Sequence, residues 1–379
     1  MRAVIVGAGI GGLAAAVALR RVGVETTVIE QVVAIRAVGA GLAIWSNALN
    51  ALRELGLETR VRAAGSVVER TLCQSPAGRI LTRTEFGNAA PNADIPCVCL
   101  HRAALQRILL EALPSHSVRT GFRCVGFSGS NALLESGETI EADLLVGADG
   151  ISSVIRKGLR GPDAPRYVGY TCWRGICPDT GMLPDRSALL AMGSGSQFGL
   201  WPCGAGQLYW FLTKTMPPGL TRSKADALAL CRTWAPPIPD AIEATPGDAI
   251  LQNDILDRPP LRWWGRGSVT LLGDAAHPST PNLGQGACQA LEDAVMLAYC
   301  LTRVRPVEAA LREYERLRIP RTSAIVRNSA QGGRVMQLDQ AVLESLRNWF
   351  IGTAPGRFLG DWLLRRALTY ALPKLSGSV

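Results

Sequence analysis

The sequence predicts an α/β protein in which a Rossmann-type lobe is interrupted by an antiparallel-sheet lobe and followed by a helical C-terminus. A β-α-β pattern fills residues 1–30, strand-like segments gather between 165 and 255, and the chain beyond 285 is mainly helical. The strand at 268–273 returns to the α/β pattern, so the first lobe is expected to be discontinuous. The expected divisions are 1–75, 97–165 and 256–330 for the Rossmann-type lobe, 76–96 and 166–255 for the inserted lobe, and 331–379 for the C-terminal helical segment.

The expected elements follow one another without internal repeats or low-complexity linkers. Strands are expected at 3–7, 25–30, 67–74, 79–85, 140–147, 167–177, 186–192, 197–203, 206–213 and 268–273, with a hairpin around 122–135. Helices are expected at 11–22, 46–55, 102–113, 222–234, 238–245 and 285–303. Beyond 303, Pro306, Pro320 and Pro355 are expected to break the helical stretch, because proline has no backbone N–H to donate.

Charge and composition narrow the class of protein. The 379-residue chain carries 40 basic and 31 acidic residues, but its arginines form no run of five or six, which argues against a nucleic-acid-binding arm. Ten cysteines without a C-x-x-C pair, together with only three histidines, predict buried thiols in a reducing cytoplasm and no metal site. Four glycines break the apolar stretch 3–19, so no membrane span is expected there.

The first motif is Gly7-x-Gly9-x-x-Gly12, placed between a strand and a helix. Gly7 permits a tight turn, Gly9 lets the backbone approach a pyrophosphate, and Gly12 allows close packing of the helix on the strand. Glu30 ends the next strand, where an acid can accept hydrogen bonds from ribose hydroxyls. The motif predicts a bound dinucleotide without separating NAD from FAD. The neighbouring residues added to the predicted site are Gly11 and Gln31.

The second motif is GDAAHPSTPNLGQGA, which begins at Gly273. Asp274 ends an apolar strand, where its carboxylate can accept hydrogen bonds from a ribityl chain. Gly284 and Gly286, followed by Ala287, open a long helix whose N–H groups can stabilise negative charge on an isoalloxazine ring. A plain strand–loop–helix connection is the alternative interpretation of this stretch.

Together these motifs resemble the flavin-dependent aromatic hydroxylases, the single-component FAD monooxygenases that include salicylate and para-hydroxybenzoate hydroxylases. The resemblance rests on GAGIGG with Glu30, on DLLVGADGISSVIRK with Asp149, and on GDAAHPSTPNLGQG. Two softer features agree, namely GAGLAIWSNALNALRELGL and the helix start HRAALQ. The motifs extend over most of the chain and imply an FAD-binding Rossmann-type lobe.

The resemblance also implies a role for each matched position. The pyrophosphate would be held by Gly7, Gly9 and Gly12, and the adenosine ribose by Glu30. Arg102 and Asp274 are matched to the ribityl–phosphate region, and Asp149 to the motif that serves both FAD and the nicotinamide cofactor. Gly286 would lie beside the flavin ring and Pro281 near the site of oxygen activation, whereas His277 is expected to be structural.

The implied reaction is reduction of FAD by NADH or NADPH, reaction with O2 to a flavin C4a-hydroperoxide, and hydroxylation of an aromatic or polyketide-like small molecule. The alternatives are an FAD-dependent epoxidase, an oxidative decarboxylase or a rearranging tailoring enzyme of secondary metabolism. A further alternative belongs to a different functional class, that of a flavoprotein that only binds and shields a reactive intermediate. Flavin-dependent halogenation is disfavoured because the W-x-W-x-I-P signature is absent.

Substrate-binding residues are expected on the inserted sheet, facing the flavin. The candidates are Trp173, Arg174, Gln197, Phe198, Trp201, Tyr209 and Phe211. Strand alternation places 197, 199 and 201 on the same face of one strand, and 209 and 211 on the same face of the next. Sheet core is the alternative interpretation of the aromatic residues. VGYTCWRG and LYWF also resemble the urate-hydroxylating branch of the family, but Gln197 stands near the position of that branch's active-site arginine, so urate is not carried over. Tyr209 is the candidate activating base.

The C-terminal segment LRNWFIGTAPGRFLGDWLLRRALTYAL is apolar and basic. It is expected to pack over the flavin lobe or a partner subunit rather than on a membrane surface. The protein is expected to act in the cytoplasm, as a monomer or homodimer, on a small aromatic substrate and O2 and without nucleic acid.

Overall fold

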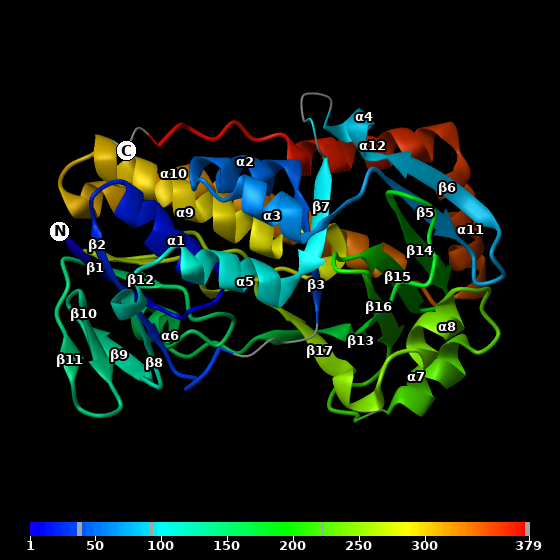
Figure 1. The fold of residues 1–379 in the computed structure, drawn as a ribbon, viewed down its shortest axis with the longest axis horizontal. Coiled ribbons are helices and arrows are strands. Elements are labelled where there is room, and N and C mark those ends of the chain that lie inside the picture. The colour runs from blue at the N-terminus through cyan, green and yellow to red at the C-terminus, as the bar shows by residue number, and fades with distance from the viewer. Residues whose placement is uncertain (36–39, 91–93, 95, 222, 376–379) are drawn as a thin grey trace.

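The computed structural model describes residues 1–35, 40–90, 94, 96–221 and 223–375. Two lobes lie side by side along the long axis of the molecule, and long helices run over the first of them (Figure 1). Residue 222, expected to begin a helix, lies outside the described residues, as do parts of the expected segments 76–96 and 331–379.

A five-stranded parallel sheet forms the centre of the first lobe. Its order is β18-β12-β1-β2-β8, and each neighbouring pair is parallel. The central strands are almost continuously apolar, because a parallel sheet is covered on both faces. The strands are β1 (Arg2–Val6), β2 (Glu25–Glu30), β8 (Val118–Thr120), β12 (Leu144–Gly147) and β18 (Val269–Leu271).

Helices from distant parts of the sequence pack on this sheet and on one another. The alanine-rich α1 contacts α5 and α9, and α9 in turn contacts α2 and α10. Small side chains on α1 allow this close approach. The helices of the lobe are α1 (Ile10–Arg21), α2 (Ser46–Glu54), α3 (Glu58–Ala64), α5 (Arg102–Glu111), α6 (Val154–Arg160), α9 (Gly286–Arg303) and α10 (Val307–Met336).

Two small sheets complete the first lobe. A meander of β9 (Cys124–Ser128), β10 (Asn131–Leu134) and β11 (Thr139–Ile140) lies before β12 and confirms the expected hairpin. A second antiparallel sheet has the order β3-β7-β4 and lies between the lobes (Figure 1). Its strands are β3 (Gly41–Trp45), β4 (Ser66–Val67) and β7 (Cys97–His101).

The second lobe is built on a seven-stranded sheet of order β17-β13-β16-β15-β14-β5-β6. All neighbouring pairs are antiparallel except β14 and β5, which are parallel. One face packs against α7 (Lys224–Cys231) and α8 (Ile238–Glu243). The strands are β5 (Arg70–Gln74), β6 (Ile80–Glu85), β13 (Arg166–Pro178), β14 (Ser187–Gly193), β15 (Ser196–Pro202), β16 (Gln207–Thr215) and β17 (Leu251–Asp257).

Several expected elements differ from the structure. The strand expected at 67–74 is two strands in different sheets, so the chain enters the second lobe at β5, before the expected boundary at 75. The strand expected at 140–147 is likewise divided between β11 and β12. Pro320 does not break the helix but lies inside α10, whereas Pro306 and Pro355 stand at helix starts, where the missing N–H is not needed.

The C-terminal segment crosses both lobes. Helices α11 (Ala341–Gly352) and α12 (Ala354–Leu368) pack on β6 and on α4 (Phe86–Ala89), beside the second lobe. The following segment, 369–375, returns over the first lobe (red in Figure 1), and the backbone N–H of Leu375 donates to Glu54. No helix among the described residues has the length and apolar character to cross a membrane.

Candidate functional site

The loop between β1 and α1 is fixed by glycines whose side-chain positions are occupied. A Cβ at Gly12 would lie 1.9 Å from the carbonyl oxygen of Gly7. A Cβ at Gly7, where φ is +107°, would lie 2.5 Å from the carbonyl oxygen of Ala148, and one at Gly11 would lie 2.8 Å from a leucine side chain. A Cβ at Gly9 would meet no atom within 4 Å. Gly9 therefore borders open space, which suits an approaching pyrophosphate.

The surroundings of this loop suit the adenosine half of a dinucleotide. Gly9 is the N-cap of α1, and no side chain caps the helix, so the first N–H groups of α1 can bind phosphate. The Glu30 carboxylate accepts the N–H groups of Ala8 at 2.8 Å and Val32 at 3.0 Å. These contacts hold the acid beside the loop and leave lone pairs for ribose hydroxyls. Gln31 follows on an exposed bend.

Asp274 and Arg102 are brought together from opposite parts of the chain. Asp274 lies in the turn after β18, and Arg102 begins α5. Burial raises the pKa of Asp274, and the charges of His277 and Arg102 act in the opposite direction. Solvent nevertheless reaches the Asp274 side chain. A carboxylate that is surrounded by protein yet reached by solvent lines a recess, and hydroxyl groups of a ligand can replace that solvent.

Asp149 stands at the carboxyl end of β12, next to the glycine loop. Its Oδ2 accepts the N–H groups of Val154 at 2.7 Å and Ile155 at 3.3 Å, so the side chain holds the start of α6. Its Oδ1 is buried without a hydrogen-bond partner among the described residues. Burial raises the pKa of Asp149, against hydrogen bonds from Ser153 and the backbone. Asp149 therefore stabilises the start of α6. Its contact with FAD or a nicotinamide cofactor stays a prediction.

The loop from Pro281 to Ala287 brings the N-terminus of α9 towards Asp274. Gly286 is the first residue of α9, and a Cβ there would lie 4.0 Å from the Asp274 carboxylate. Gly284 has a left-handed conformation with φ of +60°, and a Cβ there would lie 3.0 Å from the indole nitrogen of Trp45. Pro281 and Gly284 are exposed, and Ala287 is half-buried. The helix N-terminus can therefore meet an electron-rich ring edge.

The sheet face that meets this loop carries three of the four predicted substrate residues. Because directly paired residues share a face, the strand register places Gln197, Trp201 and Tyr209 on one side of the sheet. This confirms the expected alternation along β15 and β16. The register pairs are Gln197 with Thr213, Gly199 with Phe211, and Trp201 with Tyr209.

Two contacts join this sheet face to the first lobe. The Tyr170 hydroxyl donates to Asn282, the residue after Pro281, over 2.8 Å. Tyr209 packs on β3 so closely that a Cβ at Gly41 would lie 2.5 Å from the Tyr209 Cβ. The candidate substrate face and the loop at the start of α9 are therefore neighbours.

Trp173 lies on the opposite face of the same sheet. It is buried in the core beneath α7 and α8, together with Phe198 and Trp210. This position does not support the predicted substrate contact for Trp173, nor that for Phe198. The next residue, Arg174, is paired with Phe211 and therefore shares the face of Tyr209.

Arg174 and Tyr209 form a polar pair on the candidate substrate face. Arg174 lies near enough to Tyr209 for its charge to lower the pKa of the phenol, and it donates to Asn253 at 3.2 Å. No carboxylate forms an ion pair with Arg174 within the described residues. Burial raises the pKa of Tyr209 and Arg174 lowers it, with a net rise. The phenol is thus protonated at neutral pH, which favours a hydrogen-bonding role over the predicted role as activating base.

An aromatic wall closes one side of this region. Trp201 stacks on Phe86 with ring centroids 6.4 Å apart, and Trp45 meets both rings edge-on. Trp45 ends β3 and Phe86 begins α4, and neither was predicted as a site residue. An aromatic residue directly before a predicted helix was the available signal for Trp45. For Phe86 we find none.

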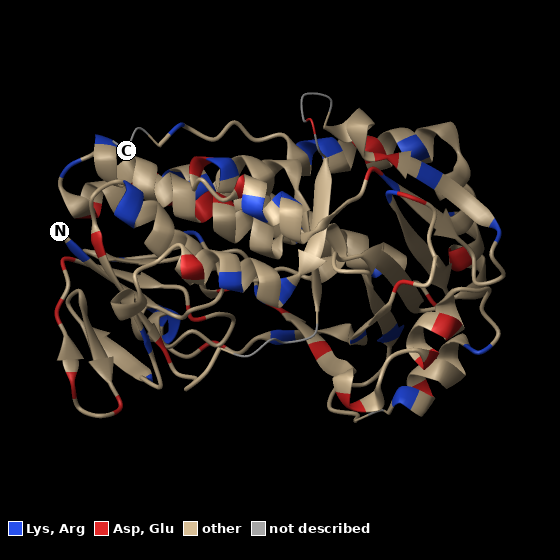
Figure 2. Ribbon diagram, viewed as in Figure 1, with Lys and Arg blue, Asp and Glu red and all other residues tan. Residues whose placement is uncertain are grey.

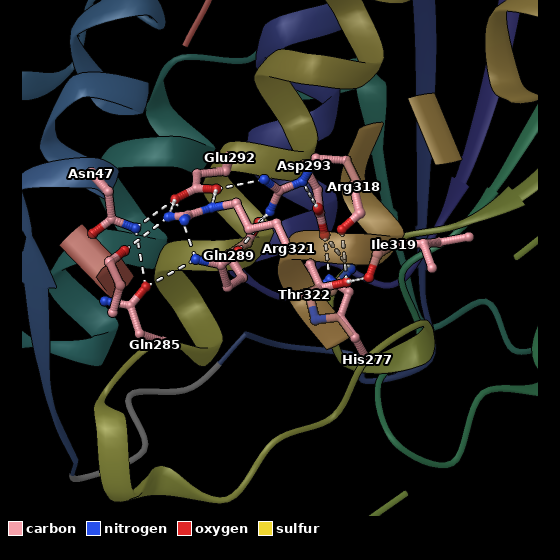
Figure 3. Close-up of polar contacts among 12 residues, drawn as sticks. Asn47, His277, Gln285, Gln289, Glu292, Asp293, Arg318, Ile319, Arg321 and Thr322 are labelled. Carbon is pink, nitrogen blue, oxygen red and sulfur yellow. Dashed lines mark hydrogen bonds and ion pairs between the residues drawn. The ribbon is translucent and has the colours of Figure 1, made fainter. Parts of the chain in front are cut away.

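A buried polar network supports the start of α9 (Figure 3). The Asn47 amide donates to Gln285 at 3.0 Å and to Glu292 at 2.6 Å. Glu292 also accepts from Arg318 at 2.5 Å and Arg321 at 2.7 Å. Gln285 is the N-cap of α9, so the network holds the residue directly before Gly286.

The second branch of the network reaches the loop after β18. Asp293 accepts from Arg318 at 2.7 Å and contacts His277 at 2.6 Å. Burial would raise the pKa of Asp293, but His277 and Arg318 lower it to about 2. His277 is buried here, as expected for a structural residue. The Tyr370 ring lies 4.3 Å from the Arg321 guanidinium and ties the C-terminal segment to the network.

Gly9→Ala tests the assignment of the glycine loop. We expect the variant to fold normally, because the new methyl group meets no protein atom, but to bind FAD about tenfold more weakly, because it occupies phosphate space. Fluorescence titration of the apoprotein with FAD measures the affinity. Gly360→Ala, at a helical position that is equally open, is the matched control and should bind FAD like the unmodified protein. Unchanged FAD affinity in Gly9→Ala would contradict the assignment.

The fold and these residues define a flavoprotein class, in which an α/β lobe presents a glycine loop, a ribose-binding acid and a helix N-terminus to FAD. A profile of the FAD binding domain family matches residues 1–165 and 257–329. The aurachin C monooxygenase/isomerase of Stigmatella aurantiaca is 41% identical over 345 residues, covering 89% of this chain and 90% of that protein. An FAD-dependent urate hydroxylase of Klebsiella pneumoniae is 33% identical over 363 residues, covering 92% and 94%.

The same relationship is seen in three dimensions. The crystal structure of Klebsiella pneumoniae HpxO complexed with FAD and uric acid superposes with a TM-score of 0.91 at 30% identity, covering 97% of both chains. The chain belongs to the FAD-binding family of flavin-dependent monooxygenases. The predicted fold, FAD cofactor and monooxygenase class are thereby confirmed.

Proposed function

We propose that this enzyme takes electrons from NADH or NADPH and uses O2 to hydroxylate an aromatic or polyketide-like molecule that carries an ionisable oxygen. The observation that carries the proposal is Arg174, a surrounded cation without an ion-pair partner among the described residues, on the sheet face next to the α9 loop. A charge in such a place favours an anionic partner, which a phenolate or carboxylate supplies.

Separate groups of residues would bind the cofactor and the substrate. Gly9, Glu30 and Asp274 would bind the phosphates and hydroxyls of FAD, which supplies the two-electron chemistry that activates O2. Arg174 would bind the substrate oxygen, and the Tyr209 hydroxyl would orient it. The wall of Trp45, Phe86 and Trp201 would hold a planar ring and exclude water.

Turnover with candidate substrates tests this proposal. The purified FAD-bound protein should consume NADH or NADPH faster when the right aromatic compound is added, and the product should gain one oxygen atom from labelled O2. A protein that retains FAD yet shows no stimulated consumption with any tested phenol, aromatic carboxylate or polyketide would favour the binding-only class.

The contribution of Arg174 can be measured directly. Arg174→Gln should raise KM for an oxygen-bearing substrate about 10- to 100-fold, because one charge-assisted hydrogen bond in a surrounded site is lost. FAD affinity should not change. Arg232→Gln, at an exposed position after α7, is the matched control. An unchanged KM in Arg174→Gln would remove Arg174 from the substrate site.

A second candidate function is oxygenation followed by rearrangement of the carbon skeleton. It is favoured by the relative named as a monooxygenase/isomerase, the 41% identical protein from Stigmatella aurantiaca. Simple hydroxylation and rearrangement both add one oxygen atom, so product mass does not separate them. The carbon connectivity of the product, determined by NMR, does.

A further inference from the structure

Exposed large apolar side chains are concentrated on the two C-terminal helices. Eight of the 18 exposed large hydrophobic side chains among the described residues fall within 342–362, and four of the five exposed aromatic ones do. Trp349 is 69% exposed and Phe358 is 73% exposed. We call this set the C-terminal apolar surface: Val342, Leu343, Leu346, Trp349, Phe350, Phe358, Leu359 and Trp362. Such a concentration marks an interaction site.

The spacing of these residues shows that each helix presents one apolar face to solvent. On α11, residues 342, 346 and 349 recur at helical spacing, as do 343, 346 and 350. On α12, residues 358, 359 and 362 do the same. The other side of α11 is anchored by Arg347, which is buried and donates to the carbonyl of Met336 at 3.0 Å. The apolar faces are therefore held outward by the fold.

The charged groups beside this surface are mainly basic. Arg357 in the first turn of α12, and Arg365 and Arg366 in its last turn, are exposed. Figure 2 shows basic positions in blue on the C-terminal helices. The Arg366 guanidinium lies 4.8 Å from the Trp362 ring centroid. The two acids of these helices, Glu344 and Asp361, are only partly exposed. The two helices together contain four arginines against these two acids, so their net charge is positive, in a chain whose formal charge is +9.

The sequence favoured packing of this segment over the flavin lobe or a partner subunit, but the exposed apolar side chains change that interpretation. We infer that the C-terminal apolar surface binds the interface of an anionic lipid bilayer. Tryptophan and phenylalanine with flanking arginines suit the boundary between lipid headgroups and acyl chains. A second copy of the chain fits less well, because two copies meeting through this surface would bring their arginine rims together. The contact is peripheral, since neither helix among the described residues can cross a membrane.

The position of the surface links it to the substrate side of the molecule. Helix α12 packs on α4, and α4 carries Phe86 of the aromatic wall. A bilayer at α11 and α12 would therefore lie beside the lobe that holds the candidate substrate face, on the far side from the glycine loop (Figure 1).

Co-sedimentation of the FAD-bound protein with vesicles tests this inference. The protein should sediment with vesicles of phosphatidylcholine containing phosphatidylglycerol, and about tenfold less with phosphatidylcholine alone. The double variant Trp349→Glu, Phe358→Glu should lower binding to the anionic vesicles at least about tenfold, because two exposed aromatic anchors become acids. Trp263→Glu, at a 40% exposed tryptophan outside the surface, is the matched control and should bind like the unmodified protein.

The retention of FAD, the binding to vesicles and the oligomeric state together separate membrane binding from its alternatives. Both the double variant and Trp263→Glu should keep their FAD, which shows that the fold is intact. Absence of sedimentation with anionic vesicles, or equal binding by the double variant, would overturn the inference. So would a dimer in light scattering that the double variant converts to monomer without any vesicle binding, since the surface would then be a contact between two copies.

Discussion

Asp274→Ala is expected to lose its FAD during a desalting step that leaves the unmodified protein fully yellow. The Asp274 carboxylate lies in the turn after β18, near Arg102, and a Cβ at Gly286 on α9 would lie 4.0 Å from it. A charge-assisted hydrogen bond to a ligand contributes about 1.5–3 kcal/mol, so the FAD dissociation constant should rise about 10- to 100-fold. Absorbance of the flavin band after desalting, and titration of the apoprotein with FAD, measure the loss.

Two further variants sharpen this experiment. Asp274→Asn keeps an acceptor oxygen without the charge and should retain FAD to an intermediate degree. Asp248→Ala, in an exposed turn of the second lobe, should behave like the unmodified protein. If Asp274→Ala stays fully yellow with unchanged affinity, the carboxylate does not bind FAD and the recess beside it has another purpose.

Glu292→Ala is expected to lower the free energy of unfolding by about 3–5 kcal/mol. Glu292 has no solvent exposure and accepts from Asn47, Arg318 and Arg321, so its loss leaves buried cations without their partner. The release of Asn47 should also loosen Gln285 at the start of α9. Denaturant unfolding followed by circular dichroism, at saturating FAD, measures the change.

The matched control is a glutamate paired on the surface of α10. Glu313 contacts Arg316 at 2.7 Å; the Arg316 side chain is exposed and that of Glu313 is partly exposed. Glu313→Ala should therefore cost at most about 1 kcal/mol. Equal effects of the two substitutions would mean that the network in Figure 3 contributes no more than a surface ion pair.

The cofactor half of the site was predictable because its residues lie in local patterns. Gly7, Gly9 and Gly12 follow a strand and open a helix, and Asp274 lies in the turn directly after a strand. Sequence spacing therefore already fixes their place in an α/β lobe. The alternation of 197, 199 and 201 was likewise readable from strand geometry.

The rest depends on tertiary packing that no local pattern records. Alternation shows that Trp173 and Arg174 face opposite sides of β13 but not which side meets the flavin lobe. Phe86 joins the aromatic wall only because α4 folds against the second sheet. Pro320 lies within α10 although proline cannot donate the helical hydrogen bond, which a local pattern would take as the end of a helix. Buried partners such as Asn47 and Glu292 are 245 positions apart.

The discontinuous build of the first lobe constrains the order of events during synthesis. The glycine loop leaves the ribosome early, but β18 and α9, which complete its sheet and carry Asp274 and Gly286, follow only after the second lobe has been made. The second lobe in turn needs β5 and β6 from the early part of the chain. All strands of the second lobe therefore precede β18 in the chain, and the first lobe cannot complete its sheet until the second lobe has been synthesised.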